Sequence, residues 1–182
     1  CAVSRLIKAR DPEAVTVFIG PCIAKKSEVV DQAIEGNADY VLTYSEIRAI
    51  MRARDVALKS CENSSQIASV YGKRFANSGG VTEAVMQSLT ESDDEIAATV
   101  CKANGASECK KALLLLKAAR LPEDFIEGMA CEGGCVGGPS AYNNQTASKK
   151  SRDALLAQAD DRGIHKNLEN YDMNSFSMHR KA

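Results

Sequence analysis

Short apolar runs alternate with longer amphipathic segments along the chain, which is the pattern of strands that alternate with helices. The first run, residues 15–19 (VTVFI), is rich in β-branched and aromatic residues. It predicts a buried strand that ends at Gly20 and Pro21. Three further runs predict strands: residues 39–43, 96–101 and 125–129.

Apolar positions three and four residues apart predict helices between these strands. The helix that follows the second strand has an apolar stripe of Ile47, Ile50 and Met51, and either Thr43 or Ser45 is placed to cap it. Four more helices are predicted over residues 2–9, 81–89, 107–119 and 148–160.

The remaining segments are expected to connect these elements. Residues 57–66 predict a polar loop, and residues 92–95 predict an acidic turn. The apolar run 112–116 predicts that its helix lies in the core. The polar residues 163–182 are expected to form a loosely ordered tail.

Alternating strands and helices predict βαβ units, and therefore an α/β fold with parallel sheets flanked by helices. The chain has 182 residues, which suits one sizeable domain or two lobes. In parallel sheets, sites form in loops that leave the carboxyl ends of strands. Residues 20–28 and 129–138 occupy that position.

Composition excludes several classes of function. The net charge is −1, so no strong field would attract nucleic acid or an anionic membrane. No apolar run approaches the roughly 20 residues of a membrane span. We expect a cytoplasmic protein without a nucleic-acid or membrane partner. The chain starts at Cys1, inside a predicted helix, so we expect it to be a piece of a longer protein.

The cysteine inventory points to a metal cluster. Seven cysteines are an odd number, which fits a disulfide framework poorly. Zinc usually takes four Cys or His ligands at short paired spacings, and His165 and His179 lie far from any cysteine in sequence. Thiolates alone are the usual ligands of iron–sulfur clusters. The sequence therefore favours an iron–sulfur site.

The first candidate loop is GPCIAKKSE, residues 20–28. Lys25 and Lys26 follow Cys22 closely, and nearby cations favour the thiolate form that binds metal. A lysine three residues after the cysteine is also placed to hydrogen-bond an anionic ligand of a metal centre. The competing interpretation is that Cys22 is a small buried apolar residue and that both lysines are solvated.

The second candidate loop is EGMACEGGCVGG, residues 127–138. Cys131 and Cys135 are four residues apart, which puts both sulfurs within reach of one cluster. Gly133 and Gly134 allow positive φ angles and a close approach of the backbone to a bulky cluster. The competing interpretation is a glycine-rich turn with two incidental thiols.

Together these loops resemble the catalytic domain of iron-only (di-iron, FeFe) hydrogenases. The family's second and third cluster motifs are similar to PCIAKKSE at residues 21–28 and EGMACEGGCVGG at residues 127–138. Between them, DYVLT at residues 39–43 and SGGVTEA at residues 78–84 resemble the family's intervening strand and helix start. The resemblance runs from about residue 2 to residue 160 and implies two lobes with the cluster site between them.

The resemblance implies an H-cluster, which is a 4Fe–4S cube joined by a cysteine sulfur to a di-iron unit that carries CO, cyanide and a dithiolate. Cys22 and Cys131 would ligate the cube, and Cys135 would bridge the cube and the di-iron unit. Lys25 would hydrogen-bond a cyanide, Met129 would pack beside the di-iron unit, and Glu28 would brace the second loop. Pro21, Gly133 and Gly134 would also contact the cofactor.

Three departures from the family pattern stand out. The first motif, of the form TSCCP, is absent and aligns upstream of Cys1, so the fourth cube ligand is missing. Gly20 stands where many members have methionine, and the third motif continues GGPSAY instead of GGGQP. These variants indicate a divergent branch. We expect the remaining thiols to be core or surface residues: Cys1, Cys61, Cys101 and Cys109.

The implied activity is the reversible reaction 2H⁺ + 2e⁻ ⇌ H₂, with electrons from ferredoxin or another carrier and with the upstream part of the same polypeptide completing the site. By itself the chain is expected to be apo and inactive. Two alternatives stay open: a hydrogen sensor that binds the same cofactor, and a scaffold for iron–sulfur assembly that keeps the cube without the di-iron unit.

Overall fold

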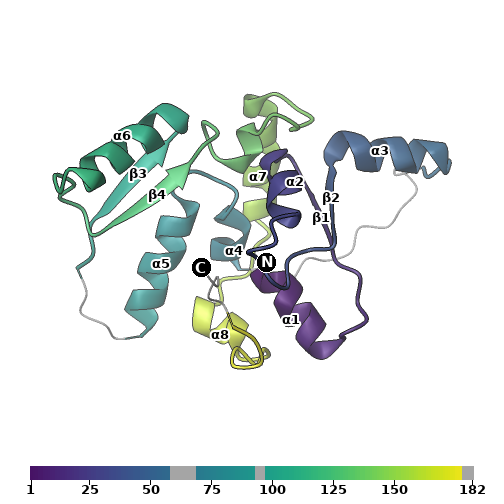
Figure 1. Cartoon of the computed structure of the whole chain (residues 1–182), viewed down its shortest axis with the longest axis horizontal. Helices are drawn as coiled ribbons and strands as arrows, with labels where there is room; N and C mark the ends of the chain where they lie inside the picture. Colours follow the sequence, from purple (N-terminus) through teal and green to yellow (C-terminus); the bar gives the residue numbers. More distant parts are fainter. Residues whose placement is uncertain (58–68, 93–96, 178–182) are drawn as a thin grey trace. The chain divides into compact units, whose positions relative to one another are not determined.

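The computed structural model describes residues 1–57, 69–92 and 97–177 (Figure 1). Their contacts divide them into two compact units. Unit 1 contains residues 1–57, 139–142 and 170–177. Unit 2 contains residues 69–92, 97–138 and 143–169.

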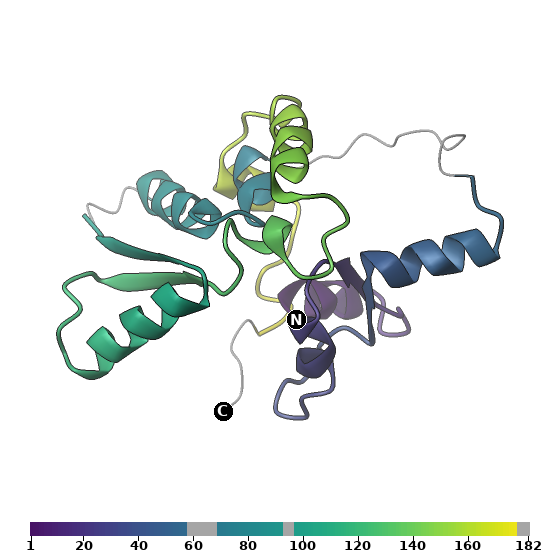
Figure 2. The ribbon, with the colours of Figure 1, turned by 90° about the horizontal axis from the view of Figure 1, so that it is seen from above.

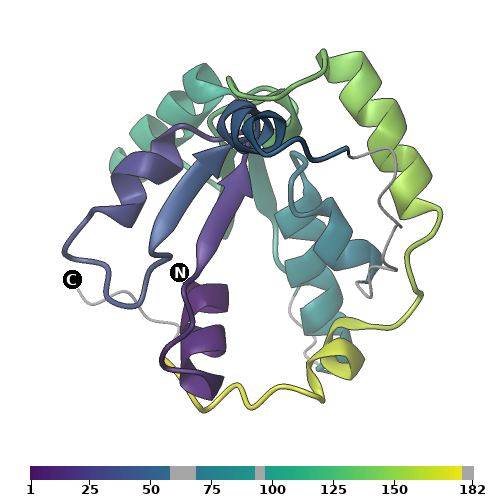
Figure 3. The ribbon, with the colours of Figure 1, turned by 90° about the vertical axis from the view of Figure 1, so that its right-hand side faces the viewer.

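Unit 1 is built on a parallel pair of strands (Figure 3). Val17 lies opposite Tyr40, and Gly20 lies opposite Thr43. Because the strands are parallel, both carboxyl ends lie at one edge of the sheet, and a helix follows each of them. The elements in chain order are α1 (Ala2–Arg10), β1 (Val17–Gly20), α2 (Ala24–Val29), β2 (Tyr40–Thr43) and α3 (Tyr44–Ala53).

Unit 2 contains a second parallel pair, in which Val100 lies opposite Phe125 and Asn104 opposite Met129. Helix α6 connects the two strands and lies along them, as Figure 2 shows. The elements are α4 (Val70–Arg74), α5 (Gly80–Glu91), β3 (Val100–Asn104), α6 (Ala106–Lys117), β4 (Phe125–Met129), the 3₁₀ turn η2 (Cys135–Gly137), α7 (Gln145–Leu156) and α8 (Ile164–Leu168).

The predicted α/β class with parallel sheets and flanking helices is confirmed. The predicted burial of the first strand is wrong: Val17, Phe18 and Ile19 are 44%, 38% and 46% exposed. The physical reason is that β1 has one strand neighbour among the described residues, so a two-stranded sheet covers little of either face. Among the helices of the described residues, none has the length and apolar character needed to cross a bilayer.

The predicted core position of residues 112–116 is also wrong for most of that run. Ala112 is buried at 3% exposure, but Leu113, Leu114 and Leu116 are each more than half exposed. Helix α6 rests on only two strands, so a narrow stripe of its surface is covered. The helices predicted at residues 107–119 and 148–160 start earlier, at Ala106 and at Gln145. The Asn144 side chain caps the second of them and accepts a hydrogen bond from the Ala147 amide at 2.9 Å.

Part of the expected loose tail is helical. The Glu91 carboxylate accepts hydrogen bonds from the backbone amides of Ile164 and His165, at 2.9 and 2.7 Å, and these amides open α8. The short helices α2 and α4 were also not predicted. Most of the predicted acidic turn at 92–95 and most of the predicted loop at 57–66 lie outside the described residues.

Of the two predicted candidates, Thr43 is the cap of α3, and it closes a reciprocal capping box. Its hydroxyl oxygen accepts from the Glu46 amide, while the Glu46 carboxylate accepts from the Thr43 amide at 2.8 Å. Lys26 and Thr43 hydrogen-bond that carboxylate and lower the pKa of Glu46 to about 2. Lys8 and Thr16 act in the same way on Asp39 and lower its pKa to about 2. Both carboxylates are therefore held at the two ends of β2.

Unit 1 should lose stability in acid. Both pKa values are lower in the folded state than the ordinary values of 3.8 and 4.5, so the two carboxylates stabilise unit 1 above about pH 4.5. This stabilisation disappears as the pH falls to about 2. We expect Asp39→Asn combined with Glu46→Gln to flatten the pH dependence between these limits. Urea denaturation at several pH values, followed through the NMR amide signals of residues 40–43, measures the free energy of unfolding of unit 1. The exposed Glu13→Gln is the control, and an unchanged slope in the double variant would contradict this assignment.

Candidate cluster site

The first loop begins where β1 ends. Gly20 closes the strand, the Pro21 carbonyl accepts a hydrogen bond from the Ser140 amide at 3.0 Å, and Cys22 is half-buried just before α2. A Cβ atom at Gly20 would lie 2.8 Å from the ring of Phe18. A larger residue at position 20 would therefore require the Phe18 ring to move.

Residues 24–29 of this loop form helix α2, where the sequence predicted an irregular loop. Lys25 and Glu28 are one turn apart on α2 and form an ion pair, with 41% and 36% of their side chains exposed. This ion pair is different from the contacts that the resemblance implies for Lys25 and Glu28. The cyanide contact of Lys25 and the bracing role of Glu28 stay predictions.

Lys26, not Lys25, ties this helix to the rest of unit 1. Its ammonium group lies 2.9 Å from a Glu46 carboxylate oxygen and 3.3 Å from the Val41 carbonyl oxygen. It thereby connects α2 to β2 and to the first turn of α3. This role was not predictable, because two adjacent lysines cannot be assigned different partners until the helix that points them in different directions is known.

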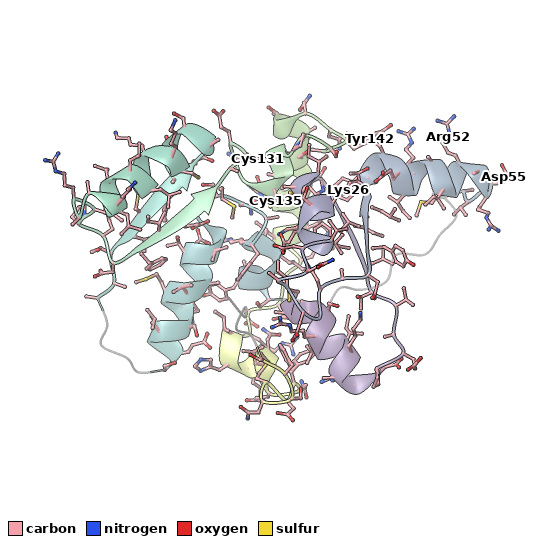
Figure 4. The ribbon with its side chains drawn as sticks, viewed as in Figure 1. Lys26, Arg52, Asp55, Cys131, Cys135 and Tyr142 are labelled. Atoms are coloured by element: carbon pink, nitrogen blue, oxygen red, sulfur yellow. The ribbon has the colours of Figure 1, made fainter. Side chains whose placement is uncertain are left out.

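The second loop leaves the carboxyl end of β4 and carries both of its cysteines (Figure 4). Cys131 is half-buried, and Cys135 is exposed at the start of η2. The Gly134 amide donates to the Cys131 carbonyl, and the Gly138 amide donates to the Cys135 carbonyl, both at 3.0 Å. The loop is thus a sequence of hydrogen-bonded turns.

Gly134 is pressed against the chain's own backbone. Its φ is +89°, and a Cβ atom there would lie 2.5 Å from the carbonyl oxygen of Ala76 and 2.7 Å from the amide nitrogen of Ser78. Gly134 also pairs with Asn77 in an antiparallel β-bridge. This packing requires glycine at position 134. The sequence analysis explains the same glycine by the close approach of a cluster. Contact of Gly133 and Gly134 with a cofactor stays a prediction.

Hydrogen bonds from two sides hold the loop. From the β3 side, the Asn104 side chain accepts from the Gly133 amide at 2.7 Å. From the segment before α5, the Ala76 carbonyl accepts from the Val136 amide, and the Ser78 amide donates to the Gly133 carbonyl, both at 3.4 Å. Both cysteines therefore lie on a braced loop.

Sequence reasoning missed Glu127. This residue of β4 is 6% exposed, and its carboxylate accepts hydrogen bonds from the amides of Gly79 and Thr82 at 2.8 and 3.0 Å. The Thr82 hydroxyl group donates to it as well. The signal in the sequence was a single charged residue inside an apolar strand, two positions before Met129. A buried carboxylate needs such donors.

The three predicted ligands are divided between the two units. Cys22 belongs to unit 1, and Cys131 and Cys135 belong to unit 2. Throughout the described residues, no three His, Cys, Asp or Glu side chains converge as a metal site would require. Of the other thiols, Cys1 is exposed, Cys101 and Cys109 are half-buried, and Cys61 lies outside the described residues.

The donor chemistry of both loops nevertheless fits an iron–sulfur cofactor. Each loop follows the carboxyl end of a parallel strand and presents thiols, the ligands that such clusters take. Cys131 and Cys135 share one short loop that is held by hydrogen bonds to β3 and to residues 76–78. These residues supply soft ligands on a braced backbone.

Comparison with known proteins agrees with this chemistry. The model of the family "Iron only hydrogenase large subunit, C-terminal domain" matches residues 1–139, which include both cysteine loops. The human nuclear prelamin A recognition factor is 25% identical over 190 residues, which cover 84% of this chain and 41% of that protein.

Two solved structures share the fold. The FeFe-hydrogenase HydA(deltaEFG), solved to follow stepwise H-cluster assembly, aligns with a TM-score of 0.60 and 19% identity. A variant of the FeFe-hydrogenase HydA1 from Chlamydomonas reinhardtii aligns with a TM-score of 0.57 and 20% identity. Each alignment covers 99% of this chain and 60% of the solved one, so the chain spans less than two thirds of these relatives. The match of the family model over residues 1–139 shows that the chain belongs to the iron-only hydrogenase large subunit family, as part of its C-terminal domain.

Proposed function

We propose that this chain is the cluster-binding part of an iron-only hydrogenase and serves the reversible reaction 2H⁺ + 2e⁻ ⇌ H₂ within a longer protein. The observation that carries the proposal is the loop with Cys131 and Cys135, braced at the carboxyl end of a parallel strand. The family model spans this loop and the loop with Cys22. A ferredoxin or a similar carrier would supply the electrons.

Each cysteine has a distinct proposed role. Cys22 and Cys131 would ligate a 4Fe–4S cube, and Cys135 would bridge it to the di-iron unit of an H-cluster. When bound, this cofactor would supply the redox and hydrogen chemistry, with the cube as the electron port. A fourth thiolate would come from another part of the longer protein, so this chain alone should be inactive.

The neighbouring side chains would position and tune the cofactor. The Lys25 ammonium group would donate to an anionic ligand of the di-iron unit, and to do so it would exchange its present partner Glu28. Glu28, once released, would be available to accept from backbone amides of the second loop. Met129, at the end of β4, would present an apolar side chain beside the site.

Membership of the family does not by itself imply hydrogen chemistry, since the human relative is named for recognition of prelamin A. The decisive test is anaerobic reconstitution with iron and sulfide, followed by electron paramagnetic resonance of the reduced sample. It is carried out on this chain and on one extended upstream through a TSCCP-type motif. We expect a stoichiometric 4Fe–4S signal only from the extended chain, and after maturation hydrogen evolution with reduced viologen.

Two results would overturn the proposal. If both chains fold and neither binds iron, the cysteines are not cluster ligands. If the extended chain holds the cube but never evolves hydrogen after maturation, the scaffold or sensor alternative would replace the catalytic one. Turnover by the present chain alone would contradict the expected need for a fourth ligand.

A further inference from the structure

Glu127 is a buried acid that the proposed chemistry does not use. Its carboxylate bonds Gly79 and Thr82, residues that belong to the start of helix α5 and not to the cysteine loop. Gly79 has a φ of +89° and provides no side chain to cap α5. The strand residue Glu127 therefore supplies the acceptor that the first amides of α5 need.

The residues that hydrogen-bond Glu127 directly follow the segment that holds the cysteine loop. Residues 76–78 lie just before α5. They form backbone hydrogen bonds with Gly133 and Val136, and Asn77 pairs with Gly134 in a β-bridge. The Gly80 amide also donates to the Asn77 carbonyl at 3.1 Å, which closes a turn between the two sets of contacts. Glu127 thus connects to the loop through one short stretch, residues 76–82.

A third element contacts this stretch. The Arg152 guanidinium group of α7 donates to the Asn77 side chain at 2.9 Å. Asn77 is 9% exposed; α7 holds its side chain, and its backbone bridges to Gly134 of the loop. A change in the position of residues 76–82 would therefore be transmitted to the loop, because the backbone of Gly134 contacts it without an intervening side chain.

We propose that Glu127 is a positioning residue for the cluster loop: by anchoring residues 79–82, it holds residues 76–78 where they fix Gly133, Gly134 and Val136, and hence Cys131 and Cys135. The relevance of this to a cofactor rests on the proposed function, but the mechanical coupling does not. Three donors meet two carboxylate oxygens, so a carboxamide in the same place would turn an NH₂ group toward an N–H donor.

The test is amide hydrogen exchange by NMR on the metal-free chain. We expect Glu127→Gln to speed exchange about tenfold at Gly79 and Thr82, which it bonds, and also at Ser78, Gly133 and Val136, which it does not bond. The control is Glu83→Gln, which removes a charge from the same turn of α5, where Glu83 pairs with Arg74 at 2.7 Å in an exposed position. It should leave the loop amides unchanged. The Asp39 amide of unit 1 serves as the internal reference.

A merely local role predicts a different pattern. If exchange accelerates at Gly79 and Thr82 alone, Glu127 caps α5 without positioning the loop, and the inference is wrong. Thr82→Val removes only the hydroxyl donor and should reproduce the coupled pattern more weakly, which keeps the test available if Glu127→Gln does not fold. Because no metal is present, failure of cluster reconstitution would count against the proposed function and not against this coupling.

Discussion

Replacing Gly134 by alanine should lower the free energy of unfolding of unit 2 by about 3 kcal/mol. Two costs add up. At a φ of +89° an L-residue is strained by roughly 1 kcal/mol relative to glycine. The new methyl group would also lie 2.5 Å from the Ala76 carbonyl oxygen, and overpacking against backbone costs roughly 1–3 kcal/mol. Urea denaturation followed by far-UV circular dichroism measures the change.

Gly72→Ala is the matched control. Gly72 lies inside α4, and the nearest atom to its new methyl group would be the Ser69 hydroxyl oxygen at an ordinary 3.8 Å. Alanine is the better helix former by about 1 kcal/mol, so this variant should be neutral or slightly more stable. Equal stability of the two variants would mean that the backbone crossing at Gly134 does not constrain the loop.

The cysteine substitutions should have the largest effect on metal content. In the chain extended upstream, we expect Cys22→Ala, Cys131→Ala and Cys135→Ala each to lower the iron bound after reconstitution by about tenfold or more, because a cube with three thiolates in place of four is no longer held closed. Iron and acid-labile sulfide per folded chain are the quantities to measure.

Cys101→Ala and Cys109→Ala are the controls of matched chemistry. Both thiols are half-buried in unit 2, and Cys109 contacts the Ala103 carbonyl of β3. Cys101 lies within β3 and Cys109 within helix α6, so neither belongs to a cysteine loop, and both variants should retain their iron. Loss of iron from a control, with retention in the Cys131 variant, would assign the cluster to other ligands.

The sequence predicted elements more successfully than burial. The strand at Phe125–Met129 and the Thr43 cap were predictable because their signals are local: a short apolar run, and a threonine three residues before a glutamate. Burial is not local. The apolar residues Phe18 and Leu113 remain exposed because the extent of the neighbouring sheet, which decides burial, cannot be read from their own segments.

In the candidate site, too, the local features were predictable and the long-range contacts were not. The two cysteine loops and their place at strand ends followed from pattern and spacing, together with the family resemblance. The residues that contact these loops could not be predicted from the sequence. Gly134 faces Ala76 and Asn77, and Glu127 faces Gly79 and Thr82, across long stretches of sequence. Lys25 pairs with Glu28 only because a short helix sets them one turn apart.

The bridge between Asn77 and Gly134 also bears on the order in which unit 2 is made. Its two residues are separated in the chain by α5, β3, α6 and β4, so the bridge closes a long loop and is entropically costly until those elements have packed. The two thiols would thus reach their final places late in folding. On the proposed function, iron would therefore enter unit 2 after it has folded, whereas a zinc finger needs its metal in order to fold.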